Sequence, residues 1–437
     1  MPHRVLHILS QRPSRTGSGV TLDSIVRCAA ERGWDQRAIV GTPADEPLPS
    51  VGTLPGDRVH PLVFGTDAFP LGLPGMSDVM PYPSRRFSSL SPEEVERYLG
   101  AFTSHVRSVL AAARPDVIHS HHVWLLSSTL RDLAPDVPIV THCHGTGLRQ
   151  MELCPHLRER VASGCARNDA FCVLHEEHAR RLTEVLGVTR DRIHVVGAGY
   201  REDIFHLSGA PEGGAQMTAP DAGRPKAGVP KPEATKAQTS GRALPRNDRP
   251  ALVFAGKFSH AKGLPSLLDA VDLLAPDFPD LVLHVAGDGS GAEAEELRAR
   301  MAGMAPRVEM HGMLDQPGLA DLLRRSHVFV LPSMYEGLPL VLVEAAACGC
   351  DLVATALPGV VQDLAPALGE QLIMVPLPPM QSVDVPDAAA LPQFATDLAS
   401  ALGHVLGRPD RGTHPDLARF RWSAVADRVE RVWRSLL

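Results

Sequence analysis

Residues 327–350 read HVFVLPSMYEGLPLVLVEAAACGC, and this stretch decides the fold. The apolar run at 328–331 is typical of a buried strand, and the proline that follows it begins a loop. Pro339 suits the first turn of a helix, because its missing N–H would have no partner there. Residues 340–347 then predict a helix that Gly349 ends. A helix that begins just beyond a strand end offers unpaired backbone N–H groups to an anion.

Two carboxylates flank the predicted anion site: Glu336 lies before the helix and Glu344 within it, with seven residues between them. Carboxylates accept hydrogen bonds from vicinal hydroxyl groups, and the helix start supplies N–H donors for a phosphate. This combination suits a nucleotide sugar. The alternative interpretation is a helix packed on a strand, with two exposed glutamates at its start.

The same stretch resembles the signature of retaining GT-B glycosyltransferases of family 4. The matching elements are Ser333, Glu336-Gly337, the spacing of the two glutamates, and the helix Glu344-Ala345-Ala346-x-Cys348-Gly349. The resemblance implies an α/β fold of two Rossmann-like domains whose parallel sheets face a central cleft. It also implies that the C-terminal domain holds the nucleotide sugar and that the N-terminal domain holds the acceptor. No cofactor besides the donor is expected.

The composition excludes several classes of protein. The chain has 437 residues and a formal net charge of −7, which predicts two or three domains and gives no basic field for nucleic acid. No apolar run approaches the ~20 residues that cross a bilayer, and the N-terminus becomes polar too soon for a secretory signal. The seven cysteines contain no C-x-x-C pair, which favours reduced thiols. We expect a cytoplasmic protein with no integral membrane segment and at most loose peripheral association.

The N-terminal strand is predicted at 5–9, followed by a loop with Gly17-x-Gly19 and then a helix. This order of elements lets a backbone approach a ligand closely. A dinucleotide fingerprint would need a third glycine where Leu22 stands, and the strand ending near Gly41 lacks the acidic residue that holds a ribose. We therefore reject a nicotinamide cofactor. Gly19 resembles the phosphate-approaching glycine of the family-4 loop, although Gly-Ser-Gly is often a simple turn.

Strands and helices alternate through the N-terminal half. Ser91 and Glu94 form a predicted capping box that begins a helix reaching about Ala113. Apolar runs predict four further strands, at residues 116–121, 137–142, 170–174 and 193–196. Such alternation is typical of a parallel sheet covered on both faces, whose ligands collect beyond the carboxyl ends of the strands.

Two groups of histidines fall at these predicted strand ends: His119, His121 and His122, then His142 and His144. With Cys143 nearby, a metal site is conceivable, but no acidic ligands accompany these imidazoles and we expect no bound metal. His144-Gly145 resembles a His-Gly pair of the family, in which the histidine lies beside the donor sugar. The resemblance implies this role for His144, with His142 as the competing choice.

Residues 207–250 break the alternation. They are rich in small residues, proline and lysine and almost lack large apolar side chains, so they are predicted to be disordered. The family usually has a shorter connection here, so the stretch resembles an insertion. It separates a predicted N-terminal domain at 1–206 from a C-terminal domain at 251–415. The helix at 416–437 is expected to cross back to the first domain.

Only five lysines occur in the chain, and two of them, Lys257 and Lys262, follow the strand predicted at 251–256. The sequence GKFSHAKG resembles the phosphate motif of the family, with Lys257 in place of the usual arginine and Lys262 matching the lysine. Lysine keeps the charge but loses the two-pronged geometry of arginine. Further elements are predicted as follows: a helix at 264–274, strands at 281–286, 308–311, 328–331 and 351–355, a Pro-rich surface loop at 375–392 and a last helix at 421–437.

Together with the resemblance, these features predict a glycosyltransferase that moves a hexosyl group from a nucleotide-diphosphate sugar to a glycan or lipid-linked acceptor. The resemblance implies that transfer proceeds with retention and without a metal. A GT-B-fold sugar-nucleotide epimerase and a non-catalytic sugar-nucleotide-binding protein are the alternatives. The expected catalytic residues are His144, Glu336 and Lys262. The expected donor-binding residues are Gly17, Gly19, Lys257, Lys262, Glu336, Gly337, Leu338, Pro339, Leu340 and Glu344.

Overall fold

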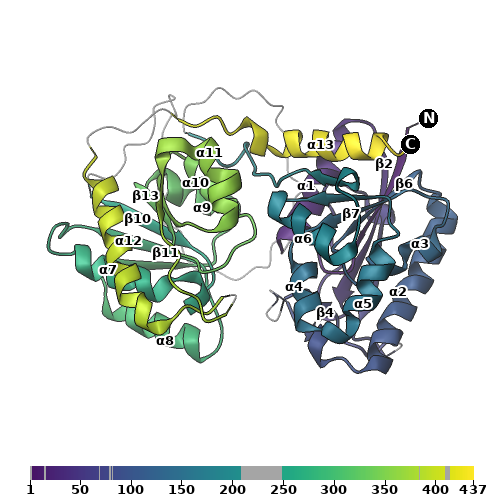
Figure 1. Cartoon of the computed structure of the whole chain (residues 1–437), viewed down its shortest axis with the longest axis horizontal. Coiled ribbons are helices and arrows are strands. Elements are labelled where there is room, and N and C mark those ends of the chain that lie inside the picture. Colours follow the sequence, from purple (N-terminus) through teal and green to yellow (C-terminus); the bar gives the residue numbers. More distant parts are fainter. Residues whose placement is uncertain are drawn as a thin grey trace, which may run out of the picture.

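The computed structural model of the chain describes residues 2–13, 16–67, 69–77, 80, 82–207, 249–382, 384–408 and 414–437. Each half of the molecule is built on a parallel β-sheet covered by helices, and the two halves lie side by side (Figure 1). This arrangement confirms the predicted fold class of two Rossmann-like domains. The predicted linker at 207–250 lies outside the described residues, except for its first residue and its last two.

The first sheet has the strand order β3-β2-β1-β6-β7-β8-β9, and all its neighbouring strands are parallel. Its strands are β1 (Arg4–Leu9), β2 (Asp35–Pro43), β3 (Val59–Phe64), β6 (Val117–His121), β7 (Ile139–Cys143), β8 (Ala170–Val173) and β9 (Ile193–Val195). Its helices are α1 (Gly17–Glu31), α2 (Pro92–Ala113), α3 (Leu130–Leu133), α4 (Thr146–Leu153), α5 (Pro155–Cys165) and α6 (Glu176–Leu186). Two short strands, β4 (Pro74–Gly75) and β5 (Arg85–Arg86), pair separately.

Helix α2 begins with the predicted capping box. The Ser91 hydroxyl accepts the N–H of Glu94 at 3.2 Å, and the Glu94 carboxylate accepts the N–H of Ser91 at 2.9 Å. These bonds satisfy two N–H groups that the helix itself leaves unpaired. The apolar face of α2 packs into the core through residues such as Phe102 and Val106. Among the described residues, no helix combines the length and the apolar character needed to cross a membrane.

The second sheet has the strand order β12-β11-β10-β13-β14-β15 and is also entirely parallel. Its strands are β10 (Ala251–Ala255), β11 (Val282–Ala286), β12 (Val308–Gly312), β13 (Val328–Leu331), β14 (Asp351–Thr355) and β15 (Leu372–Val375). Its helices are α7 (Leu264–Leu274), α8 (Ala292–Gly303), α9 (Gln316–Arg324), α10 (Val341–Ala347), α11 (Ala365–Leu368) and α12 (Leu391–Leu406).

In both sheets the strand order reverses at one internal position. The reversal lies between β1 and β6 in the first sheet and between β10 and β13 in the second. Open parallel sheets bind ligands beyond the carboxyl ends of the strands at such a position, because the loops there diverge to opposite faces and leave a crevice. The loops after these four strands are therefore where the fold itself favours a ligand.

The last helix, α13 (Trp422–Arg434), lies on the first half of the molecule (Figure 1). Trp433 packs edge-on against Trp34, with ring centroids 4.9 Å apart, in a cluster that includes Val5 and Ile25. The indole N–H of Trp34 also donates to the Glu430 carboxylate at 3.0 Å. The C-terminal helix thus completes a core that begins with the first strand of the chain.

Both ends of the Pro-rich stretch 375–392, predicted as a surface loop, belong to regular elements. Val375 ends β15, and Leu391 begins α12, whose Leu398 is fully buried. The prediction was wrong at both ends because the prolines hide the apolar pattern that continues on either side. Pro392 stands in the first turn of α12, where a missing N–H costs no hydrogen bond.

Candidate active site

The loops that follow β10 and β13 touch each other where the order of the second sheet reverses. Gly263 has a φ of +67°, and a Cβ atom at this position would lie 1.9 Å from the carbonyl oxygen of Pro332. Only glycine allows this approach, so the turn before α7 is held directly against the loop after β13. The contact brings Lys262 of the first loop beside Glu336 of the second.

Lys262 and Glu336 form an ion pair with an Nζ–Oε1 distance of 2.6 Å. The Ser333 hydroxyl donates to the same carboxylate oxygen at 2.8 Å. The two charged side chains keep 30% and 18% of their surface exposed, so a ligand can reach both. An arriving phosphate would compete for the ammonium group, and an arriving sugar hydroxyl would compete for the carboxylate.

Glu344 lies on α10 and is partly buried. Loss of water around its carboxylate raises the pKa of Glu344 to about 7. No side-chain hydrogen bond or ion pair reaches this carboxylate from the described residues. A carboxylate that has lost water without gaining a partner is unfavourable, and a ligand that brings hydroxyl donors would satisfy it.

Glu344 lines a cavity of about 420 Å³ between the two halves of the molecule. The remaining lining comes from both halves and from α13: Gln11, Thr16, Gly17, Ser18, Val20, Thr21, Met76, Ser77, Met80, His122, His144, Thr146, Leu174, Ala198, Gly199, Gln316, Gly337, Leu338, Leu340 and Trp422. Among these described residues the polar side-chain groups other than Glu344 are hydroxyls, amides, imidazoles and the indole N–H of Trp422. Such a lining suits a ligand with many uncharged hydroxyl groups.

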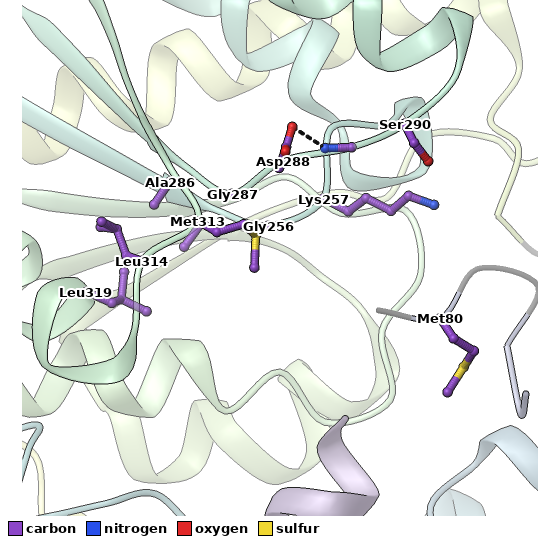
Figure 2. A pocket seen from close by; sticks show the side chains of 12 residues that line it. Met80, Gly256, Lys257, Ala286, Gly287, Asp288, Ser290, Met313, Leu314 and Leu319 are labelled. Atoms are coloured by element: carbon purple, nitrogen blue, oxygen red, sulfur yellow. Dashed lines mark hydrogen bonds between the residues drawn. The ribbon is translucent and has the colours of Figure 1, made fainter. Parts of the chain in front are cut away.

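A second cavity of about 580 Å³ lies beyond the carboxyl ends of β10, β11 and β12 (Figure 2). Its wall combines apolar side chains with the backbone around Gly287, and Met80 faces them from the opposite side. The Lys257 side chain extends along the open side of this space, and no hydrogen bond or ion pair reaches its ammonium group from the described residues. Met80 lines both cavities, so the two spaces adjoin.

The residues predicted from the sequence are distributed over these neighbouring places. The 420 Å³ cavity is lined by six of them: Gly17, His144, Gly337, Leu338, Leu340 and Glu344. Lys257 lines the second cavity, and Lys262 and Glu336 form the ion pair between the loops. Pro339 is buried. Gly19 lies in the first turn of α1, where its N–H already donates to the Thr16 hydroxyl at 3.2 Å.

Several lining residues were missed by reasoning from the sequence. Gln11 and Thr16 belong to the loop after β1, and the rule that ligands gather beyond strand ends could have identified them. Gln316 and Trp422 gave no such signal, because they reach the cavity only through the way distant elements pack together.

The histidines at the ends of β6 and β7 form a buried stack. The rings of His142 and His144 are nearly parallel, at 9°, with centroids 4.4 Å apart, and the rings of His119 and His142 are 5.5 Å apart. His121 Nδ1 lies 3.0 Å from His144 Nε2. His144 lines the cavity between the halves, whereas His142 is fully buried and neither of its ring nitrogens has a hydrogen-bond partner among the residues that the structure describes. The geometry therefore favours His144 over His142 as the residue that meets a ligand.

Burial lowers the pKa of His142 to about 3. An unfolded chain binds that proton near pH 6.5. The contribution of His142 to the free energy of unfolding is therefore fully present above pH 6.5 and is lost as the pH falls toward 3. We expect His142→Leu to reduce the stability loss between pH 7 and pH 5 by about 2 kcal/mol, measured by urea unfolding at both pH values. His156→Leu, at an exposed position on α5, is the control and should leave the loss unchanged. Equal losses in both variants would contradict the prediction.

Comparisons with known proteins agree with this architecture. A family described as "Glycosyl transferases group 1" matches residues 249–378, and one described as "Glycosyl transferase 4-like domain" matches residues 16–199. A D-inositol 3-phosphate glycosyltransferase from Xylanimonas cellulosilytica is 28% identical over 358 residues, which cover 78% of this chain and 76% of that protein. A glycogen synthase from Mycobacterium tuberculosis is 28% identical over 329 residues, covering 73% and 69%.

Solved structures with the same fold span almost the whole chain. Sucrose-phosphate synthase from Thermosynechococcus elongatus has a TM-score of 0.62 at 17% identity, covering 99% of both chains. Anabaena HepE in complex with UDP-glucose has a TM-score of 0.57 at 14% identity, again covering 99% of both chains. At these identities the likeness concerns the fold.

Proposed function

Because the chain belongs to the group 1 glycosyltransferases with the GT-B fold, we propose that it transfers a hexosyl group from a nucleotide-diphosphate sugar to a glycan or lipid-linked acceptor. The observation that carries this proposal is the meeting of Lys262 and Glu336. Their ion pair lies where the second sheet reverses its strand order, in loops that adjoin the cavity between the two halves. A cation for phosphate and a carboxylate for hydroxyls there match the two ends of a sugar-phosphate bond.

Lys257 and Lys262 are proposed to hold the diphosphate. Negative charge accumulates on the departing diphosphate as the bond to the sugar breaks, and fixed cations stabilise that charge without reorganising. Lys262 is oriented by Glu336 before the donor arrives, and Lys257 projects into the adjoining cavity without a described partner. We propose that these side chains meet the charge and that no metal ion or further cofactor takes part.

Glu336 and His144 are proposed to orient the hexose, and Glu344 to accept hydrogen bonds from the ribose hydroxyls. His144 and Glu344 line the same cavity, and Gly337 and Leu338 continue its wall directly after Glu336. The adjoining cavity of about 580 Å³, with its apolar wall, has the character that a nucleobase requires. Transfer with retention is part of the proposal.

Donor and acceptor are proposed to bind to different halves of the molecule. Residues 251–415 would hold the donor and residues 1–206 the acceptor, with 207–250 as the linker and 416–437 as the helix that returns to the first half. The uncharged polar groups that the first half gives to the cavity support an acceptor that presents sugar hydroxyls. A cytoplasmic location, with at most loose peripheral association with membranes, is part of the proposal, and the seven cysteines, all of them in the described part of the chain, form no disulfide.

A panel of sugar nucleotides tests the proposal by thermal shift. A donor present at 100 times its dissociation constant should stabilise the fold by about 2.7 kcal/mol. UDP-glucose is the first candidate, since HepE, a structure of similar fold, was solved with it. Nucleoside monophosphates are the control and should stabilise less, because they lack the phosphate that Lys262 would bind. If no member of the panel raises the melting temperature, the proposed donor site is wrong.

Incubation with a radiolabelled donor separates the proposal from its alternatives. A transferase moves the label to an acceptor or, without one, releases the sugar slowly by hydrolysis. A GT-B-fold epimerase would convert the sugar while it remained attached to the nucleotide, and a non-catalytic binding protein would return the donor unchanged.

A further inference from the structure

Two neighbouring strands at the edge of the second sheet bring two imidazoles and a carboxylate together. His284 lies on β11, and Glu309 and His311 lie on the edge strand β12. His284 Nδ1 is 3.0 Å from His311 Nε2 and 3.4 Å from Glu309 Oε2. Each residue offers one ligand atom, and these atoms all lie within 4.8 Å of one another.

The strand register explains why these side chains meet. His284 and Glu309 are paired directly across the two parallel strands, so their side chains point to the same face of the sheet. The register shifts after Val285, where β12 accommodates one extra residue between Met310 and Gly312, and that residue is His311. Such an irregularity re-aims a side chain locally, and here it brings the His311 ring to that of His284.

The ring geometry suits a shared ion. A tetrahedral Zn²⁺ with Zn–N distances of about 2.0–2.1 Å holds two nitrogens roughly 3.3 Å apart, close to the 3.0 Å observed between His284 and His311. In the structure these two nitrogens face each other at hydrogen-bonding distance, with the ring planes inclined at 55°, and one ion could replace the shared proton. The buried group of His121, His142 and His144 differs because it includes no carboxylate to balance the charge of an ion.

We propose that His284, Glu309 and His311 bind one transition-metal ion of the zinc class, with water in the remaining position. Two imidazoles and one carboxylate favour Zn²⁺ over Mg²⁺ or Ca²⁺, which prefer sets made only of oxygen. The His284 side chain is only 12% exposed and therefore rigid, whereas the Glu309 side chain is 46% exposed and leaves an entry path from solvent. Glu309 also supplies negative charge where Arg249 and Arg325 contribute positive charge.

The site lies next to the cavity proposed for the nucleobase. Ala286 follows His284 by two residues, and Met313 follows His311 by two residues, and both line that cavity. An ion bound by residues of both strands would join the edge strand β12 to β11 immediately before the residues that line the cavity. The ion would thus stabilise the wall without touching the donor.

Metal binding to the purified, chelator-treated full-length chain tests the proposal. Titration calorimetry with Zn²⁺ alone should give one site per chain, and Co²⁺ should give the visible absorption of a tetrahedral complex. We expect His284→Ala and His311→Ala each to weaken binding by at least 100-fold. Glu309→Gln should weaken it by at least 10-fold, because the shape remains but the charge is lost. Excess Mg²⁺ should not displace the bound ion.

Two controls make the result decisive. His260→Ala removes a histidine whose ion-pair partner in the described part of the chain is Glu293, at 3.8 Å, and should leave Zn²⁺ affinity unchanged. His142→Leu should also leave it unchanged, because it alters only the buried stack. Melting of metal-free His311→Ala shows whether the variant is folded, and Zn²⁺ should raise the melting temperature of the wild type but not of this variant. Absence of Zn²⁺ binding to the wild type, or loss of binding in His142→Leu but not in His311→Ala, would overturn the proposal.

Discussion

Replacement of Lys262 by alanine is expected to lower kcat for glycosyl transfer by about 10²–10³-fold, which corresponds to about 2.7–4 kcal/mol of lost transition-state stabilisation. The proposed partner of Lys262 is the diphosphate, which gains charge as the bond to the sugar breaks. Loss of the Lys262 ammonium should therefore lower kcat more than it changes the KM for the donor, because the diphosphate carries less negative charge in the bound donor than in the transition state. Steady-state kinetics with varied donor concentration measure both quantities.

Two further variants sharpen the test of Lys262. Lys262→Arg keeps the cation and should recover part of kcat. Glu336→Ala removes the carboxylate that lies 2.6 Å from the Lys262 ammonium, and should impair both kcat and KM because the proposed hexose contact is lost. Free nucleoside diphosphate should still bind the Glu336 variant nearly as well as the wild type. If Lys262→Ala and Glu336→Ala both stay within twofold of the wild type, the donor is bound elsewhere.

Replacement of Glu344 by glutamine is expected to stabilise the fold and to weaken donor binding. Burial raises the pKa of Glu344 from an ordinary value of 4.5 to about 7. Between these values the folded chain keeps a proton that the unfolded chain has released, so the free energy of unfolding falls as the pH rises from 4.5 to 7. Glutamine cannot ionise, so Glu344→Gln should be more stable than the wild type at pH 8 by up to about 3 kcal/mol.

Ionisation of Glu344, which should destabilise the fold, should strengthen donor binding. An ionised carboxylate accepts hydrogen bonds from the ribose hydroxyls, so the wild-type KM for the donor should fall as the pH rises through 7. The KM of Glu344→Gln should change little with pH. Above pH 7 it should exceed the wild-type KM by a factor that corresponds to about 1–3 kcal/mol of binding free energy. Urea unfolding and donor kinetics at pH 6 and pH 8 measure both effects. A wild-type KM that does not change over this range would exclude Glu344 from the ribose contact.

Much of the fold could be predicted because short local patterns in the sequence determine many of its strands and helices. The strand, loop and helix at 327–350 were recognisable from an apolar run, two prolines and a glycine, and Gly349 adopts the positive φ that ends α10. The capping box at Ser91 and the strand at 351–355 follow from equally local signals. These predictions needed no knowledge of which elements pack together.

The side-chain partnerships could not be predicted in this way. The sequence suggested Lys262 and Glu336 separately, but their ion pair joins residues 74 positions apart and depends on the fit of Gly263 against Pro332. The cluster of His284 and His311 depends on a shift of strand register, which leaves no mark in the composition of either strand. Such features depend on the detailed packing of distant segments, and the hydrophobic periodicity of the sequence does not predict them.

The position of α13 also has a consequence for the order in which the chain folds during synthesis. The Trp433 ring belongs to the same buried cluster as Val5 and Trp34, yet it is made 399 residues after Trp34. Residues 196–421, 226 in number, separate the last strand of the first sheet from α13, and a ribosome needs on the order of 10–50 s to add them. Throughout that interval the nascent first half presents an uncovered apolar face, which gives chaperones a surface to hold. This core closes only after α13 has been added.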